Sequence, residues 1–146
     1  MKSKSQRLAV VLTLAERKED SAMDALRQAR RYLDDQERQL SGLESYHQQY
    51  IQNYRESMAS RVTIHQLQSY QGFIEQLDKA ISHQQAVVET ARQQFERERQ
   101  QWIECREKRK GLADLIERYR QQEQLASDKR DAKRIEDDLN SRRLRS

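Results

Sequence analysis

The side chains of this sequence that most often bind metals or act as nucleophiles are three histidines and one cysteine. His47, His65 and His83 are spaced by eighteen residues. That spacing is about 27 Å on a helix rising roughly 1.5 Å per residue, too far to share a metal ion. No carboxylate or thiolate completes a ligand set with them if the chain folds back, so we expect no metal site. Cys105 has no second cysteine to pair with and is expected to pack as a small apolar residue.

Catalytic motifs are also missing from the sequence. It contains no glycine-rich phosphate loop, no His-Glu-x-x-His pattern and no Cys-x-x-Cys pair. We therefore predict a protein that is not an enzyme and needs no cofactor. The apolar run from Leu8 to Ala15 is followed by charged residues where a signal peptide would be cleaved. No run approaches the roughly 20 apolar residues of a membrane span, and we expect a cytoplasmic protein.

The composition favours long exposed helices over a globular core. Of the 146 residues, 36% are charged and 35% are apolar, none is proline and only three are glycine. So few apolar residues cannot fill a thick core, but a coiled-coil seam needs only about two apolar residues in seven. The 28 basic and 24 acidic residues are interleaved and leave a net charge of +4, which argues against disorder.

Two ladders of seam positions, each stepping by three or four residues, predict two coiled-coil helices. Eleven of the fifteen positions in the first ladder are apolar, and fourteen of the eighteen in the second. The first ladder is Leu8, Leu12, Ala15, Glu19, Ala22, Leu26, Ala29, Leu33, Gln36, Leu40, Leu43, His47, Tyr50, Tyr54 and Ser57. The second is Leu67, Tyr70, Ile74, Leu77, Ile81, Gln84, Val88, Ala91, Phe95, Glu98, Trp102, Cys105, Arg109, Leu112, Ile116, Tyr119, Glu123 and Ala126.

The lapse between the ladders predicts a short loop, and a short loop makes the two helices antiparallel. We predict an all-α fold, a long antiparallel two-stranded coiled coil with an overhanging C-terminal helix, as one domain over residues 1–146. Its parts are helix one at 5–57, a loop at 58–63, helix two at 64–140 and a frayed tail at 141–146. Residue i then faces roughly residue 122 − i, so helix two continues alone beyond Gln121.

The loop end of this hairpin is poor in charge and rich in tyrosine. The fifty residues from Gln39 to Val88 hold only seven charged residues but four of the six tyrosines. Outer faces of solvated coiled coils normally carry charge, whereas protein interfaces are depleted in charge and enriched in tyrosine. The sequence therefore predicts a protein-binding surface in this half.

Two stretches in that half resemble the flagellar export protein FliJ family. The first is Gln39-Leu40-x-x-Leu43-x-x-Tyr46-x-x-x-Tyr50, and the second is Tyr70-Gln71-x-Phe73-Ile74-x-x-Leu77-x-Lys79-Ala80-Ile81. The resemblance implies a cytoplasmic, non-enzymatic stalk of the flagellar type III export apparatus, associated peripherally with the inner membrane. Proteins of this family bind and assemble a hexameric export ATPase, contact the membrane export gate and bind export chaperones.

The resemblance also implies site residues. The family's gate-binding surface falls on eight positions of this sequence: Gln39, Leu43, Tyr46, Tyr50, Phe73, Leu77, Ala80 and Gln84. The family has a histidine where this chain has Gln84. Tyr46 and Phe73 lie off the ladders, and we expect them to be exposed.

The resemblance implies that the paired terminal ends of the hairpin insert into the ATPase, and in this sequence the terminal part of helix two extends beyond helix one. The candidate contacts of this part are Leu125, Ile135, Leu139, Arg142 and Arg143. Interleaved acidic residues argue against a nucleic-acid partner for the basic tail. A hairpin of this kind is expected to be a monomer when free. The alternatives are the stalk of a related virulence-type secretion ATPase, or a structural coiled-coil scaffold that dimerises.

Overall fold

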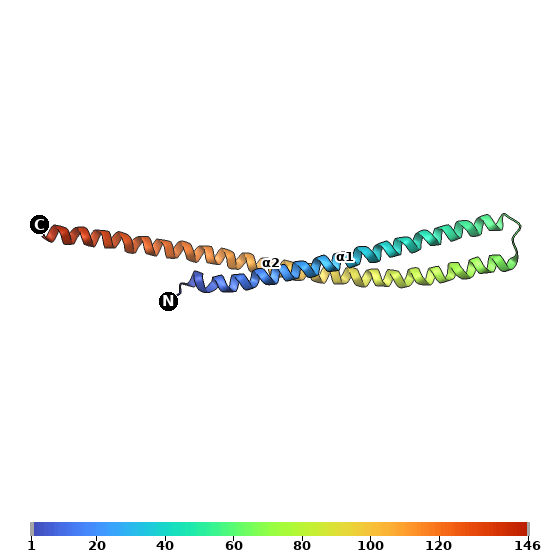
Figure 1. The fold of residues 1–146 in the computed structure, drawn as a ribbon, viewed down its shortest axis with the longest axis horizontal. Helices are drawn as coiled ribbons and strands as arrows, with labels where there is room; N and C mark the ends of the chain where they lie inside the picture. The colour runs from blue at the N-terminus through green and yellow to red at the C-terminus, as the bar shows by residue number, and fades with distance from the viewer. Residues whose placement is uncertain (1, 146) are drawn as a thin grey trace. The chain divides into compact units, whose positions relative to one another are not determined.

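The computed structural model describes residues 2–145 as two α-helices, α1 (Lys4–Met58) and α2 (Ile64–Arg145), joined by residues 59–63 (Figure 1). No strand occurs in this described range, and the two helices pack against each other, which confirms the all-α helical hairpin. The sequence analysis ends helix two at residue 140, but α2 continues through residues 141–145 of the predicted frayed tail. No proline or glycine interrupts that stretch. Ser146 lies outside the described residues.

The start of each helix is fixed by a capping box. The backbone N–H of Gln66 donates to Thr63 Oγ1, and the Thr63 N–H donates back to Gln66 Oε1, both at 3.2 Å. Ser3 and Gln6 make the same reciprocal pair at the start of α1, at 3.1 and 3.3 Å. Each box satisfies two backbone donors that a helix N-terminus otherwise leaves without partners. The boundary between loop and second helix is therefore set by side chains, without glycine or proline.

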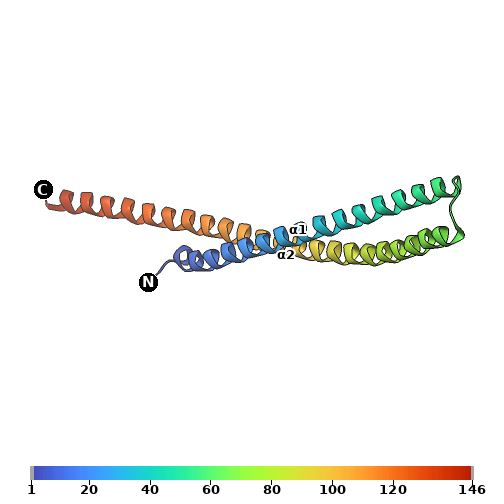
Figure 2. The same cartoon turned by 45° about the vertical axis from the view of Figure 1, so that its right-hand side comes forward.

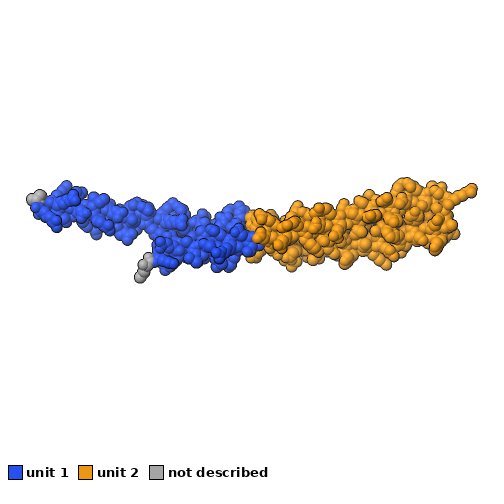
Figure 3. Space-filling view, viewed as in Figure 1, with its two compact units in different colours: residues 1–21, 103–146 blue, residues 22–102 orange. Residues whose placement is uncertain are grey.

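The chain divides into two compact units, coloured separately in Figure 3, and both helices contribute to each. Unit 1 comprises residues 1–21 and 103–146, and unit 2 comprises residues 22–102 with the connecting loop. In unit 2, α1 and α2 lie side by side and run antiparallel (Figure 2). Its best-buried apolar cluster joins Leu33 of α1 to Val88 and Ala91 of α2. Leu40 and Phe95 pack against this cluster.

Unit 1 is held by a seam that contains both apolar and polar contacts. Ile116 is almost fully buried there, and Ser5 is the best-buried described polar residue. Ser5 Oγ donates to Glu123 Oε2 at 2.6 Å, and its backbone N–H donates to Glu123 Oε1 at 3.2 Å. Further along the same seam, Arg109 pairs with Glu19. The interhelical packing of this unit therefore combines apolar contacts with matched polar pairs.

The two predicted ladders coincide with the observed seam. All fifteen positions of the first ladder are buried or half-buried, and so are seventeen of the eighteen in the second. The exception is Ala126, which is exposed because α1 provides no residue to cover it beyond Ser5 and Glu123. A ladder period of 3.5 residues keeps one stripe of a helix facing its partner, so spacing alone identified the buried face.

The predicted register, in which residue i faces residue 122 − i, is accurate near the loop but wrong by several residues near the N-terminus. Residue 72 was expected opposite Tyr50, and Phe73 is found there. Residue 103 was expected opposite Glu19, but Glu19 pairs with Arg109. Side chains on a helix tilt toward its N-terminus, so in an antiparallel pair both partners lean toward each other's higher-numbered neighbours. The same offset of six residues is found at Ser5, which was expected opposite residue 117 and pairs with Glu123.

Candidate functional site

Of the histidines and the cysteine, only His47 and Cys105 lie in the seam between the helices. His47 is half-buried in the seam, with its Nε2 2.6 Å from Asp78 Oδ1, while His65 and His83 are exposed. No group of three or more His, Cys, Asp or Glu side chains within residues 2–145 could hold a metal ion. Cys105 is half-buried on the second ladder. The remaining candidate sites are surfaces of the two helices.

The predicted gate-binding residues of α1 form a partly exposed stripe in unit 2. Gln39 and Tyr46 are exposed, with Tyr46 at 59%, whereas Leu43 and Tyr50 are half-buried at the seam. They step by three or four residues, which keeps them on one side of the helix. The exposure predicted for Tyr46 from its place off the ladder agrees with the structure.

The predicted gate-binding residues of α2 divide into surface and seam. Phe73 is 41% exposed and Ala80 is half-buried, whereas Leu77 and Gln84 are each only 8% exposed. Gln84 Nε2 donates to the backbone carbonyl of Gln36 at 3.0 Å and to its Oε1 at 2.8 Å. In this conformation Leu77 and Gln84 are covered by α1 and cannot touch a partner. Leu77 and Gln84 pack in the seam under the exposed residues of this surface. The gate-binding role of the exposed positions stays a prediction.

An aromatic cluster holds the exposed Phe73 in place. Its ring centroid lies 4.4 Å from that of Tyr50, with the planes inclined at 33°. Tyr70 contacts both Tyr50 and Tyr54 at centroid distances of 6.4 and 6.5 Å. The Tyr54 hydroxyl accepts a hydrogen bond of 2.9 Å from Gln71 Nε2. Packed aromatic pairs of this geometry each contribute about 0.5–1.5 kcal/mol beyond burial, so the surface is presented in a fixed shape.

The aromatic cluster borders a hollow of about 410 Å³ at the loop end of unit 2. It is lined by uncharged residues: Tyr50, Ser57, Val62, Gln66, Ser69, Tyr70 and Phe73. Concave, mostly apolar surfaces with a few polar groups are the usual seats of a partner's side chains. The predicted gate-binding surface therefore borders a concave region that could accommodate a side chain of the partner.

The predicted ATPase-binding residues lie on the end of α2 that α1 does not cover. Leu125 and Ile135 are each 62% exposed and Leu139 is 51% exposed, and Arg142 and Arg143 are exposed as well. Every described residue from 128 to 145 is exposed. Leu125, Ala132, Ile135 and Leu139 follow one another at steps of seven, three and four residues. They therefore lie on one face of the helix.

Two carboxylates of unit 1 are held ionised by the neighbouring helix. Hydrogen bonds from the guanidinium of Arg109 hold the pKa of Glu19 below its usual value, and the positive charges of Arg109, Arg106 and Lys110 act in the same direction against the cost of desolvation. Hydrogen bonds from the hydroxyl and the backbone N–H of Ser5 lower the pKa of Glu123. These pairs were not predicted from the sequence. Glu19, Arg109 and Glu123 are polar residues at ladder positions, which is a signal for polar contacts in the seam, but the predicted register did not place Glu19 opposite Arg109, and Ser5 precedes the first ladder.

Comparisons with known proteins agree with this picture. The family model described as "Flagellar FliJ protein" matches residues 3–146. The flagellar FliJ protein of Escherichia coli (strain K12) is 28% identical over 130 residues, which cover 89% of this chain and 88% of that protein. None of the helices within residues 2–145 is both long and apolar enough to cross a membrane.

The fold is a coiled-coil hairpin with exposed aromatic and apolar side chains. The chain belongs to the flagellar FliJ protein family, which the matches along nearly its whole length establish. The resemblance inferred from the tyrosine-containing stretches is thereby confirmed. Membership supports a part in the flagellar export apparatus that is structural and not enzymatic.

Proposed function

We propose that this protein is a stalk of the flagellar export machinery that links the hexameric export ATPase to the membrane export gate. The observation that carries the proposal is the uncovered end of α2, where residues 128–145 continue as helix with no part of α1 beside them. Ile135 and Leu139 are more than half exposed on this end. Apolar side chains on an uncovered helix face are typical of surfaces that another protein buries.

The charges of this end suit insertion into a protein ring. Arg130, Lys133 and Arg134 are exposed on it, and Arg142 follows near its end. Acidic residues such as Glu136 are interleaved with them, which favours a protein partner over nucleic acid. We assign Leu125, Ile135, Leu139, Arg142 and Arg143 to the ATPase contact.

The loop end supplies the second contact. Tyr46 and Phe73 are exposed in a part of the chain with few charges, next to a hollow that is free of charged lining. Tyrosine and other aromatic side chains are enriched at interface centres. We assign the exposed Gln39, Tyr46 and Phe73, together with the half-buried Ala80, to the contact with the cytoplasmic domain of the export gate.

The remaining parts of the proposal come from family membership alone. The protein is expected to bind export chaperones, although no residue of this chain points to their site. It acts in the cytoplasm at the inner-membrane export apparatus, and it is a monomer before it meets the ATPase.

Deletion of residues 128–146 tests the proposal. The full chain is expected to stimulate the flagellar export ATPase of the same organism, and the deletion variant is expected not to. The control is Tyr46→Ala, which alters only the loop end and should stimulate the ATPase normally. Equal stimulation by the deletion variant and the full chain refutes the stalk assignment for this end.

A further inference from the structure

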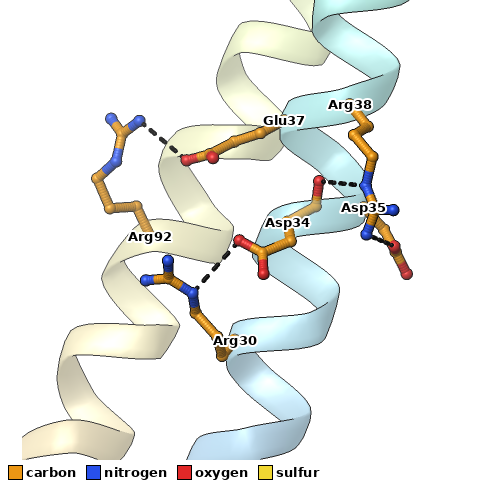
Figure 4. A network of polar contacts seen from close by, with 6 residues as sticks. All are labelled: Arg30, Asp34, Asp35, Glu37, Arg38 and Arg92. Atoms are coloured by element: carbon orange, nitrogen blue, oxygen red, sulfur yellow. Dashed lines mark hydrogen bonds and ion pairs between the residues drawn. The ribbon is translucent and has the colours of Figure 1, made fainter.

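The seam of unit 2 has two flanks that differ in charge. On one flank, Glu37 of α1 pairs with Arg92 of α2 across the helices at 3.6 Å (Figure 4). Arg30 and Asp34 pair along α1 at 3.3 Å beside them. Charged residues beside a seam are the usual arrangement in a two-stranded coiled coil. This charged flank therefore carries the side chains expected on a coiled-coil surface that faces water.

The opposite flank carries two rows of uncharged residues at heptad spacing. The row on α1 is Tyr32, Gln39 and Tyr46, and the row on α2 is Phe73, Ala80 and Val87. Residues seven apart stay on the same side of a coiled-coil helix. Five residues separate Tyr32 from Glu37 and Val87 from Arg92, which is about 140° around each helix. We call these two rows together the tyrosine flank.

Two hollows lie along the tyrosine flank, each of about 410 Å³. The first is the one beside Tyr50 and Phe73 at the loop end. The second is lined by Tyr32, Ala86, Val87, Thr90, Ala91 and Gln94, which are all uncharged. On α2 the first hollow is lined by residues between Gln66 and Phe73, and the second by residues between Ala86 and Gln94. The midpoints of these two stretches are separated by about three heptads, roughly 30 Å along α2. Each hollow is open to solvent and can admit an apolar side chain.

We propose that the tyrosine flank is a docking groove for one amphipathic helix of a protein partner. The helix lies along the seam as a third strand of the coiled coil and places large apolar side chains, about three heptads apart, in the two hollows. Helices whose apolar stripe extends beyond the seam onto a flank are those that pack against further helices. A partner with charges on this face is disfavoured, because no residue of the two rows can compensate a buried charge.

The inference rests on the proposed function in one respect. The hollow at Phe73 belongs to the surface assigned to the export gate, so the purified cytoplasmic domain of the gate is the partner to use. What is new is the extent of the site and the form of its ligand. Contact reaches Tyr32 and Val87, far beyond the aromatic cluster, and the ligand is a helix.

Binding of the gate domain to the full chain can be measured by isothermal titration calorimetry with three variants. Tyr32→Ala and Val87→Lys alter the second hollow and are expected to weaken binding by roughly tenfold or more. The matched control is Gln85→Lys, which adds the same charge to an exposed position of α2 on the charged flank. It should bind within about twofold of the unmodified chain. Tyr32 is an exposed side chain, so Tyr32→Ala is expected to fold normally even if Val87→Lys does not.

Hydrogen exchange on the gate domain tests the form of the ligand. One helical segment of the gate should become protected in the complex, and Tyr32→Ala should reduce that protection. Protection of a strand or loop instead overturns the helix-docking proposal.

The variants also separate this inference from the gate assignment. If Tyr46→Ala and Phe73→Ala weaken binding while Tyr32→Ala and Val87→Lys do not, the docking groove is wrong and the gate surface stands. If only Tyr32→Ala and Val87→Lys weaken binding, the gate domain contacts the second hollow alone, and a groove that spans both hollows is overturned. Unchanged binding in all four variants overturns both.

Discussion

Arg109 and Glu19 make a two-pronged ion pair in the middle of the seam of unit 1. Arg109 Nε donates to Glu19 Oε2 at 2.7 Å, and Nη2 donates to Oε1 at 3.2 Å. Both side chains are mostly covered, with 31% and 18% of their surface exposed. Both also occupy ladder positions where an apolar residue is the rule. A polar pair in a seam is satisfied in one alignment only, so it specifies which residues of the two helices face each other.

Removing one partner of this pair is expected to destabilise the hairpin more than removing both. Arg109→Leu leaves a half-covered carboxylate without its hydrogen bonds, and Glu19→Leu leaves the guanidinium alone. The double variant replaces the pair by two apolar residues and should recover much of the lost stability. Urea unfolding of the four proteins gives the comparison as a double-mutant cycle.

The exposed pair Arg92 and Glu37 provides the control for this cycle. Its atoms are 3.6 Å apart and about half of each side chain is exposed. Pairs of this kind contribute only about 0–1 kcal/mol, so the same four-protein cycle should show little coupling. Equal coupling at both sites contradicts a special role for the pair in the seam.

Stability is expected to fall with acidification through the carboxylates of unit 1. The pKa values of Glu19 and Glu123 are lower in the folded chain than their ordinary value of 4.5. A carboxyl of this kind stabilises the fold above its unfolded pKa, and the contribution is lost as the pH falls through the folded pKa. Urea midpoints measured from neutral pH to well below 4.5 should therefore decrease.

Ser5→Ala and Glu123→Gln identify the source of that decrease. Ser5→Ala removes the hydroxyl hydrogen bond to Glu123 but keeps the backbone one, and Glu123→Gln removes the titrating carboxyl itself. Both should show a shallower fall in stability with acid, and Glu123→Gln should show the larger effect. Glu136→Gln is the control, since Glu136 is exposed on the uncovered end of α2. A pH dependence that is the same in all three variants assigns the effect to other carboxylates.

The seam of this fold was predictable because its period is imposed by geometry. A stripe that faces a partner helix must repeat every 3.5 residues, so a count along the sequence found nearly every buried position. The same count explains why Leu77 and Gln84 are poor surface candidates, since both are ladder positions and both are buried. Family resemblance had placed them on the gate surface, but their spacing places them beneath it.

The pairing of residues across the seam was harder to predict. A loop position fixes the backbone alignment, whereas contacts depend on the lean and length of each side chain, as Glu19 and Arg109 illustrate. The site at Tyr32 was missed for another reason. Its sequence neighbours Arg30, Arg31 and Asp34 are charged, and only the heptad spacing from Tyr46 separates its face from theirs. Tyr32 is recognised as part of this surface when residues are grouped by helix face instead of by their neighbours in the sequence.

The capping box at the start of α2 is expected to contribute measurably to stability. Thr63→Val keeps the shape of the side chain but removes the hydroxyl that accepts from the Gln66 N–H. Loss of an N-cap costs about 0.5–2 kcal/mol, which urea unfolding can resolve. Thr13→Val is the control, because Thr13 is exposed inside α1 and its hydroxyl only donates to the backbone carbonyl of Ala9. Similar losses in both variants contradict a special role for the cap.

A glycine inside α2 offers a stabilising substitution. Gly111 is helical, and a Cβ added to it meets no heavy atom within 4 Å. Alanine is favoured over glycine in a helix interior by about 1 kcal/mol, so Gly111→Ala should raise the urea midpoint. Gly111→Pro is the opposite case and should disrupt the helix, because proline removes a hydrogen bond and clashes with the preceding turn. Destabilisation by alanine indicates that the position needs the freedom of glycine.

The uncovered end of α2 is expected to become ordered only in a complex. Residues 128–145 are helical but exposed throughout, and an isolated helix of this length is marginal in water. Backbone amides there should exchange quickly in the free protein, whereas those around the buried Ile116 should be protected. Addition of the export ATPase should protect the end strongly. Deletion of residues 128–146 should hardly change the urea midpoint, because the described part of this segment is uncovered and the seam up to Glu123 remains. Strong protection in the free chain, or a large loss of stability on deletion, shows that this end already has a partner within the hairpin or in a second copy.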